Sequence, residues 1–353
     1  MPVLSPTERM VKCPTAHCPG WIAVDSHRPQ TVPCRYCRVT VHTLAYLLGQ
    51  TDVAARTAAE GAPAIDLLAP ALHDAFNGLM LAQAGATGGN VYLRPTERAL
   101  VGITASPRGV TIEYNAALAA RLGPAALIGL LMHRLLHGEL HPRSERVWRA
   151  EPKPGGRQEL AWLGGYLPTV VDHVWLEPRL EARAPGVGAA FAAWGLDVAL
   201  LLSGGESLLP DFVGARVRDE IARLSAQPDV TPEALRAWLL ERLTDLCHAY
   251  FGLQREETNR FALAVILGDL RLRNPDAAGS LADGLEARET LNLREAQPLA
   301  DRLHRELHDL RTAVVPTAPV DTNAFRNGLD AALKALNVHT YFDLRPVKSD
   351  GRA

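Results

Sequence analysis

The sequence lacks the two patterns that send a chain into or across a membrane. Its first thirty residues have no basic start followed by an apolar stretch, so no export signal is expected. No run of about 18 uninterrupted apolar residues occurs either. We therefore expect a soluble, cytoplasmic protein without a membrane partner. Its 47% hydrophobic content over 353 residues is ample for a sizeable core.

An excess of charge of either sign is also missing. Lys and Arg total 37, and Asp and Glu total 39, so the overall charge gives no reason to expect nucleic acid as the main partner. The glycine-rich segments 85–89 and 203–206 lack the Gly-Lys-Ser/Thr ending of a phosphate loop and the spacing of a dinucleotide fingerprint. No G-x-S-x-G motif occurs. The usual nucleotide-binding and serine-hydrolase patterns are therefore absent.

Cysteine is scarce, yet four of the five cysteines crowd near the N-terminus: Cys13, Cys18, Cys34 and Cys37. Their C-x4-C and C-x2-C pairs, fifteen residues apart, have the spacing of a zinc ribbon. Without an export signal, such clustering favours a metal over disulfides. We predict one structural zinc ion whose four thiolate ligands leave no open position for chemistry. Two alternatives remain: His17 replaces Cys18, or the cysteines stay reduced without a metal.

Composition and periodicity predict a predominantly helical α+β chain in four parts. These are a zinc ribbon, a core with a small antiparallel sheet, a helical region, and a linker with a terminal helix and tail, at residues 1–42, 43–185, 186–312 and 313–353. The sheet is expected from three β-prone segments between residues 90 and 115, separated by turn signals.

Apolar spacing and helix-ending residues predict the helices. Two are expected between residues 43 and 87. A buried apolar helix should begin near Gly123-Pro124 and end before Pro142, and an exposed loop should follow at 143–158. Further helices are expected at 160–183, 187–202, 211–225, 232–252, 256–273 and 286–312, and finally from Thr322, as the cap, to Leu336.

Histidine spacing marks the buried helix. Twelve histidines placed at random would give roughly 0.4 pairs four residues apart, whereas the chain has three, which are 133/137, 137/141 and 304/308. Two such imidazoles lie about 40° apart around a helix and about 6 Å along it, so both reach one metal ion. We expect His141 to cap the helix end, and His304 and His308 to lie on a solvated face.

The segment from about residue 90 to 185 resembles the bacterial zincin-like metallopeptidases, whose active helix carries the motif HExxH. The matching features are a strand from Ile112 to Asn115, an apolar helix that leads to His133 and His137, and a downstream helix. The resemblance implies that these two histidines are paired ligands of a second zinc ion. It also implies His173 as the third ligand, with Asp172 or Glu177 as substitutes.

One residue departs from the family pattern. The family's glutamate, which takes a proton from metal-bound water, falls at Arg134 in this chain, and arginine stays protonated and cannot act as that base. Asp172 and Glu177 are weak candidates for a relocated base. Three hypotheses remain open: core histidines left from an ancestral site, metal binding without peptidase activity, and a hydrolase with a modified mechanism.

A non-enzymatic adaptor is the competing class of function. Arg, Trp and Tyr side chains near the ribbon, such as Trp21 and Tyr36, can stack on bases. We therefore keep nucleic acid as a possible partner of the ribbon, beside the protein or peptide partner that a metallopeptidase relative implies.

Overall fold

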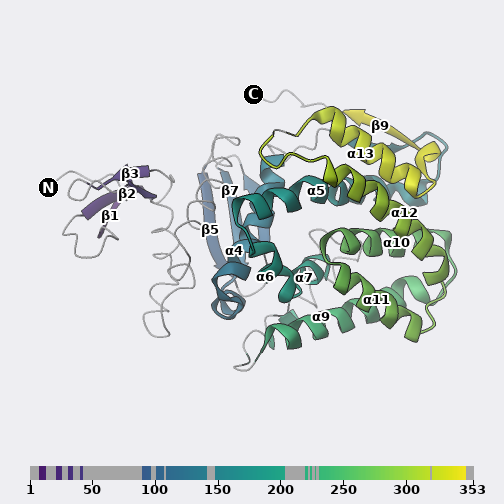
Figure 1. Cartoon of the computed structure of the whole chain (residues 1–353), viewed down its shortest axis with the longest axis horizontal. Coiled ribbons are helices and arrows are strands. Elements are labelled where there is room, and N and C mark those ends of the chain that lie inside the picture. Colours follow the sequence, from purple (N-terminus) through teal and green to yellow (C-terminus); the bar gives the residue numbers. More distant parts are fainter. Residues whose placement is uncertain are drawn as a thin grey trace. The chain divides into compact units, whose positions relative to one another are not determined.

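A computed structural model describes most of the second half of the chain and selected parts of the first. The described residues are 8–12, 21–25, 31–34, 40–42, 90–96, 101–106, 109–140, 148–202, 219–221, 223–224, 227, 230–318 and 320–346. The chain is predominantly helical with small sheets, as an α+β protein was predicted to be (Figure 1). It forms two compact units, 1–143 and 144–353. The sequence-based domain boundaries stay predictions.

Two short antiparallel hairpins form the start of the first unit. β1 (Glu8–Lys12) pairs with β2 (Trp21–Asp25), and β3 (Thr31–Pro33) pairs with β4 (Thr40–His42). In the sequence, one cysteine pair falls in the segment between the strands of each hairpin. Cys34 directly follows β3 and is buried. Cys13, Cys18 and Cys37 lie outside the described residues, as do the two helices expected between 43 and 87, so the zinc ribbon stays a prediction.

A three-stranded sheet forms where the sequence predicts one, but its strand directions differ. Its order is β5-β7-β6, for β5 (Asn90–Thr96), β6 (Val101–Ser106) and β7 (Gly109–Asn115). β6 and β7 are antiparallel, whereas β5 and β7 are parallel. The prediction of a wholly antiparallel sheet was therefore wrong. β7 takes the central position, where β-branched residues pack well, and Pro95, which cannot donate a hydrogen bond, lies on the edge strand β5.

Helix α4 (Ala116–Leu140) follows β7 without a loop. It begins seven residues before the predicted Gly123-Pro124 start, because Ala116 to Leu122 are mostly strong helix formers. The predicted burial is confirmed: Ile128, Met132 and Leu136 are all fully enclosed. His141 and Pro142 lie outside the described residues, so the predicted cap at His141 stays a prediction.

The second unit consists of helices packed around α10 (Glu257–Arg273). α10 runs beside α12 (Leu293–Thr312) and also contacts α11 (Pro275–Ala287) and α5 (Ala161–Arg183) (Figure 1). Twelve residues of α10 are buried, which makes it the core of the unit. Further helical elements of this unit are η3 (Gln158–Leu160), α6 (Val187–Ala193), α7 (Leu196–Leu202), α9 (Pro232–Cys247), the π-helix η4 (His248–Gly252), α13 (Thr322–Ala335) and η5 (His339–Tyr341).

Several predicted helices are confirmed with altered ends. The predicted 187–202 helix is broken by Gly195, whose φ of 66° belongs to the left-handed region that glycine adopts easily. The predicted 286–312 helix begins only at Leu293, and α11 precedes it although no helix was predicted there. Asp321, rather than Thr322, caps α13 by accepting from the backbone N–H of Asn323. Most of 211–225 lies outside the described residues.

A strand pair replaces part of the predicted loop 143–158. β8 (Trp148–Pro152) pairs antiparallel with β9 (Phe342–Pro346). Helix α5 packs closely on β8, since a Cβ added at Gly164 would lie 2.1 Å from the carbonyl oxygen of Ala150. Only glycine permits this approach.

Among the helices of the described residues, none has the length and apolar character needed to span a membrane.

Candidate metal centre

Two histidines of the candidate centre lie on α4. His133 and His137 are four residues apart, and their ring centroids are 5.0 Å apart at an interplanar angle of 78°. His133 is fully buried and His137 is half-buried. Helical periodicity places them on one face. The i,i+4 pair predicted from the sequence therefore has the geometry of a chelate.

The third histidine lies on α5. His173 is fully buried, and its Nδ1 lies 2.7 Å from Oδ1 of Asp269 on α10, which is buried to the same extent. A carboxylate in this position fixes the orientation and the tautomer of an imidazole, as it does for many histidines that bind metals.

The three imidazoles can hold one metal ion. One ligand atom from each of His133, His137 and His173 lies within 4.8 Å of the others. Within the described part of the chain, no other group of three or more histidines, cysteines or carboxylates meets this condition. These residues are the ligand set that the resemblance implied, and neither Asp172 nor Glu177 belongs to the group. Three nitrogen ligands leave a fourth position open around a tetrahedral ion.

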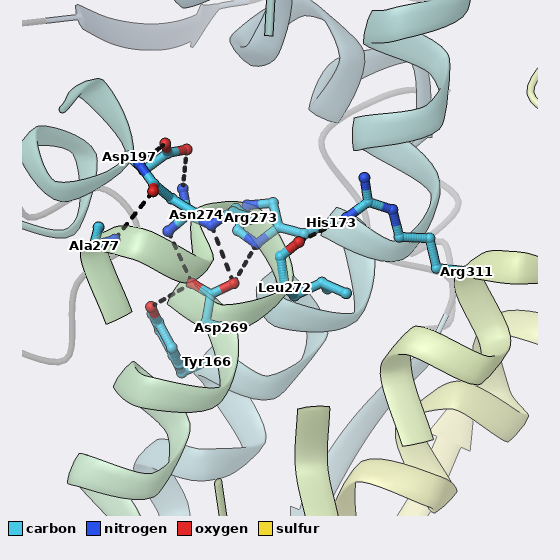
Figure 2. Close-up of polar contacts among 9 residues, drawn as sticks. All are labelled: Tyr166, His173, Asp197, Asp269, Leu272, Arg273, Asn274, Ala277 and Arg311. Atoms are coloured by element: carbon cyan, nitrogen blue, oxygen red, sulfur yellow. Dashed lines mark hydrogen bonds and ion pairs between the residues drawn. The ribbon is translucent and has the colours of Figure 1, made fainter. Parts of the chain in front are cut away.

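Behind His173 lies a buried chain of charged groups (Figure 2). Arg273 donates from Nε and Nη2 to the two carboxylate oxygens of Asp269, over 3.2 and 3.0 Å. Its Nη1 donates to Asp197 on α7 over 3.2 Å, and Asn274 donates to the other oxygen of Asp197. The side chains of Asp269 and Arg273 are fully enclosed. Helices α5, α7 and α10 are thus joined through one hydrogen-bonded network.

Burial and charge shift the acidity of this network in opposite directions. Burial alone would raise the pKa of Asp269, but Arg273 and His173 outweigh it and bring the pKa to about 2. Burial raises the pKa of Asp197 although Arg273 and Asn274 oppose the change. Asp269 is therefore ionised at neutral pH.

The two candidates for a relocated base also lie on α5. Asp172 is buried but is adjacent in sequence to His173, so it points about 100° away around the helix. Glu177 follows His173 by one turn and shares its face. Burial, and then the charge of Asp197, raise the pKa of Glu177 to about 8. Of the two, Glu177 has the acidity of a group that exchanges a proton near neutral pH.

Arg134, which stands where the HExxH motif of the resemblance has its glutamate, also lies on α4. Arg134 is half-buried and directly follows His133. Since an arginine holds its charge, the position that would supply a base instead supplies a cation.

Sequence reasoning missed the charged residues that support His173. Asp269, Arg273 and Asp197 were not singled out, because single charges in a helix usually face solvent. One signal was available: Asp269 and Arg273 are four residues apart in a helix whose preceding turns are almost wholly apolar.

The second histidine pair of the described chain has no such surroundings. His304 and His308 on α12 have ring centroids 5.6 Å apart, tilted by 32°. His308 is exposed, as predicted, whereas His304 is half-buried.

Comparison with known proteins gives no match: no family model, no curated protein and no solved structure is similar to this chain.

Proposed function

We propose that the protein is a metallopeptidase-like zinc protein with two zinc ions, one in the N-terminal cysteine cluster and one held by His133, His137 and His173. The observation that carries the second site is the convergence of the three imidazoles within 4.8 Å. A buried environment and three nitrogen donors suit Zn²⁺, which prefers imidazole and tetrahedral coordination. The carboxylate beside His173 supports the same assignment.

We further propose that this centre binds its ligand without hydrolysing it by the usual route. That route needs a carboxylate within reach of the metal-bound water, and Arg134 occupies its place in the motif. The bound metal would act as a Lewis acid toward a carbonyl or carboxylate of a peptide or protein partner. Arg134 would contribute a fixed positive charge near an anionic group of that partner.

A working hydrolase with a relocated base is the second candidate, and Glu177 favours it. This carboxyl group lies one turn from His173, and its pKa of about 8 lets it hold or release a proton near neutral pH.

Zinc counting and one pair of variants test the proposal. The full chain should contain two zinc ions. If it contains only one, and cysteine substitution abolishes that one, the proposed zinc site at the histidines is contradicted. Arg134→Glu restores the family motif and should introduce cleavage of a denatured protein substrate that the natural protein does not cleave. Arg134→Gln, which removes the charge without adding a base, is the matched control and should stay inactive.

Activity in the natural protein would instead select the second candidate. It should then be lost in Glu177→Gln while both zinc ions are retained. Activity that survives both Glu177→Gln and His137→Ala would contradict both forms of the proposal.

A further inference from the structure

The buried carboxylate of Asp269 needs a physical explanation. An ionised carboxylate in a protein interior is costly unless donors surround it. Asp269 is fully enclosed, and it meets His173 at 2.7 Å and Arg273 through two hydrogen bonds, with Tyr166 donating to Oδ2 over 3.5 Å (Figure 2). All three neighbours therefore present donors to one acceptor.

These contacts define which nitrogen of His173 carries the proton. A carboxylate that accepts two bonds from a guanidinium has no proton to donate. The short contact to His173 must then be an Nδ1–H donation to Asp269 Oδ1. In the neutral imidazole, this tautomer puts the lone pair on Nε2, which becomes the ligand atom.

Asp269 is held in place from its own helix, α10, and Arg273 extends the network to α7. Arg273 donates hydrogen bonds to both carboxylate oxygens of Asp269, and its Nη1 donates to Asp197 on α7. The second oxygen of Asp197 accepts from the side chain of Asn274. Asn274 also caps α11 by accepting from the backbone N–H of Ala277 (Figure 2). The position of the carboxylate is thus defined by groups on α10 and α7 and at the start of α11.

We infer that Asp269 is a positioning residue: its contact with Nδ1 of His173 presents Nε2 of that ring to the candidate metal centre. The metal part of the inference rests on the proposed function. The competing explanation is an ion-pair network that only joins α5, α7 and α10. The two explanations agree on stability and differ on the state of His173 and on zinc.

The tautomer of His173 is the first test, and it needs no metal. In the metal-free full chain, imidazole nitrogen NMR across the pH range, assigned by the resonance lost in His173→Gln, should show the proton on Nδ1 whenever the ring carries a single proton. Asp269→Asn should mix the two tautomers. A ring protonated at Nε2 in the natural protein would overturn the inference, whether or not zinc binds.

Zinc affinity is the second test, with Asp197→Asn as the matched control. Both changes remove a buried carboxyl partner of Arg273, so both should destabilise the fold. Asp269→Asn should weaken the histidine-dependent zinc ion by about 10- to 100-fold, and Asp197→Asn by much less. Chelator competition on the full chain measures the zinc affinity. The zinc ion of the histidine site is identified as the one that the His137→Ala variant lacks.

Equal losses of affinity in the two variants would show a purely structural network and contradict the inference. If the natural protein has no histidine-dependent zinc ion, the proposed function fails, and the tautomer result still decides whether Asp269 orients His173. If Asp269→Asn does not fold, the tautomer of the natural protein decides alone.

Discussion

Helices α4 and α12 each carry two histidines four residues apart, yet their surroundings differ. On α4 the rings of His133 and His137 are 5.0 Å apart, His133 is fully buried and His137 is half-buried, and His173 lies within reach of the same ion. On α12 the rings of His304 and His308 are 5.6 Å apart, His308 is exposed, and no third ligand was found within the described residues.

The comparison shows what helical spacing contributes to a metal site and what it leaves out. Spacing puts two imidazoles on one face in both helices. Burial excludes competing water, and a third ligand from another helix completes the coordination. Only the α4 pair has both, so the two pairs form a natural test and control.

The largest expected effect is on zinc itself. His137→Ala should lower the zinc content from two ions per chain to one, with a loss of affinity of more than about 100-fold, because a direct ligand contributes more than an outer partner. His308→Ala, with the same spacing on α12, should leave the content unchanged. Equal zinc loss in both variants would show that spacing alone governs binding, and it would contradict the distinction between the α4 and α12 pairs.

The next effect concerns the position of α5, which carries the third histidine, His173. In Gly164→Ala the new Cβ would meet the backbone of Ala150 at 2.1 Å, and no side chain can move to relieve the contact. We expect a loss of about 3 kcal/mol in the free energy of unfolding, together with weaker zinc binding at His173.

Gly165→Ala is the control, because nothing lies within 4 Å of its added Cβ. Alanine favours the helix there by up to about 1 kcal/mol. Urea denaturation of the two variants measures both changes, and a Gly164→Ala variant as stable as Gly165→Ala would refute the close packing of α5 on β8.

The raised pKa of Glu177, one helical turn from His173, should make the stability of the protein depend on pH. The pKa of Glu177 is raised from 4.5 in the unfolded chain to about 8, because of burial and of Asp197, with Arg273, Arg311 and Asp269 also nearby. The folded state therefore binds a proton that the unfolded state has already lost. This contribution to stability is fully present below pH 4.5 and decreases by at most about 1.4 kcal/mol per pH unit until the pH passes about 8.

Glu177→Gln should flatten this slope, since its side chain does not titrate, and should make the protein more stable than the natural chain at pH 8. Glu286→Gln, at an exposed position on α11, should keep the natural slope. Unfolding by urea between pH 5 and 8.5 separates these outcomes. An unchanged slope in Glu177→Gln would rule out a neutral, half-buried carboxyl group at Glu177 in the folded protein.

The smallest expected effect lies within the α12 pair. Burial, then His308, then Arg271 lower the pKa of His304. His308→Gln removes one of these causes and should raise the pKa of His304 only in part, because burial remains. Histidine NMR titration measures the change, and a fall in the pKa would contradict the assumed repulsion between the rings.

The local parts of the fold were predictable because local patterns determine them. Helices α5 and α10 were predicted from apolar periodicity within a few residues of their ends. The start of α4 was placed too late because Pro124 was taken as its first residue, although the helix includes it as an interior position. Helix α11 was missed even though Asn274 followed by Pro275 has the pattern of a cap and first residue.

The non-local parts could not be derived from the same patterns. The pairing of β8 with β9 and the parallel pairing of β5 with β7 depend on which segments meet in space. The histidines of the candidate centre were predicted through their spacing and the resemblance. Asp269 was not, because its role depends on a neighbour 96 residues away in sequence.

The pairing of β8 with β9 has a consequence for how the protein is made. Near this pair, the Lys153 side chain donates to the carbonyl of Thr340, 187 residues later. At about 5 to 20 residues per second, a ribosome takes about 10 to 40 s to synthesise the interval. During that time β8 has no partner strand, and α5 packs on an incomplete strand pair. A nascent chain at this stage should be the form most exposed to chaperones and proteases.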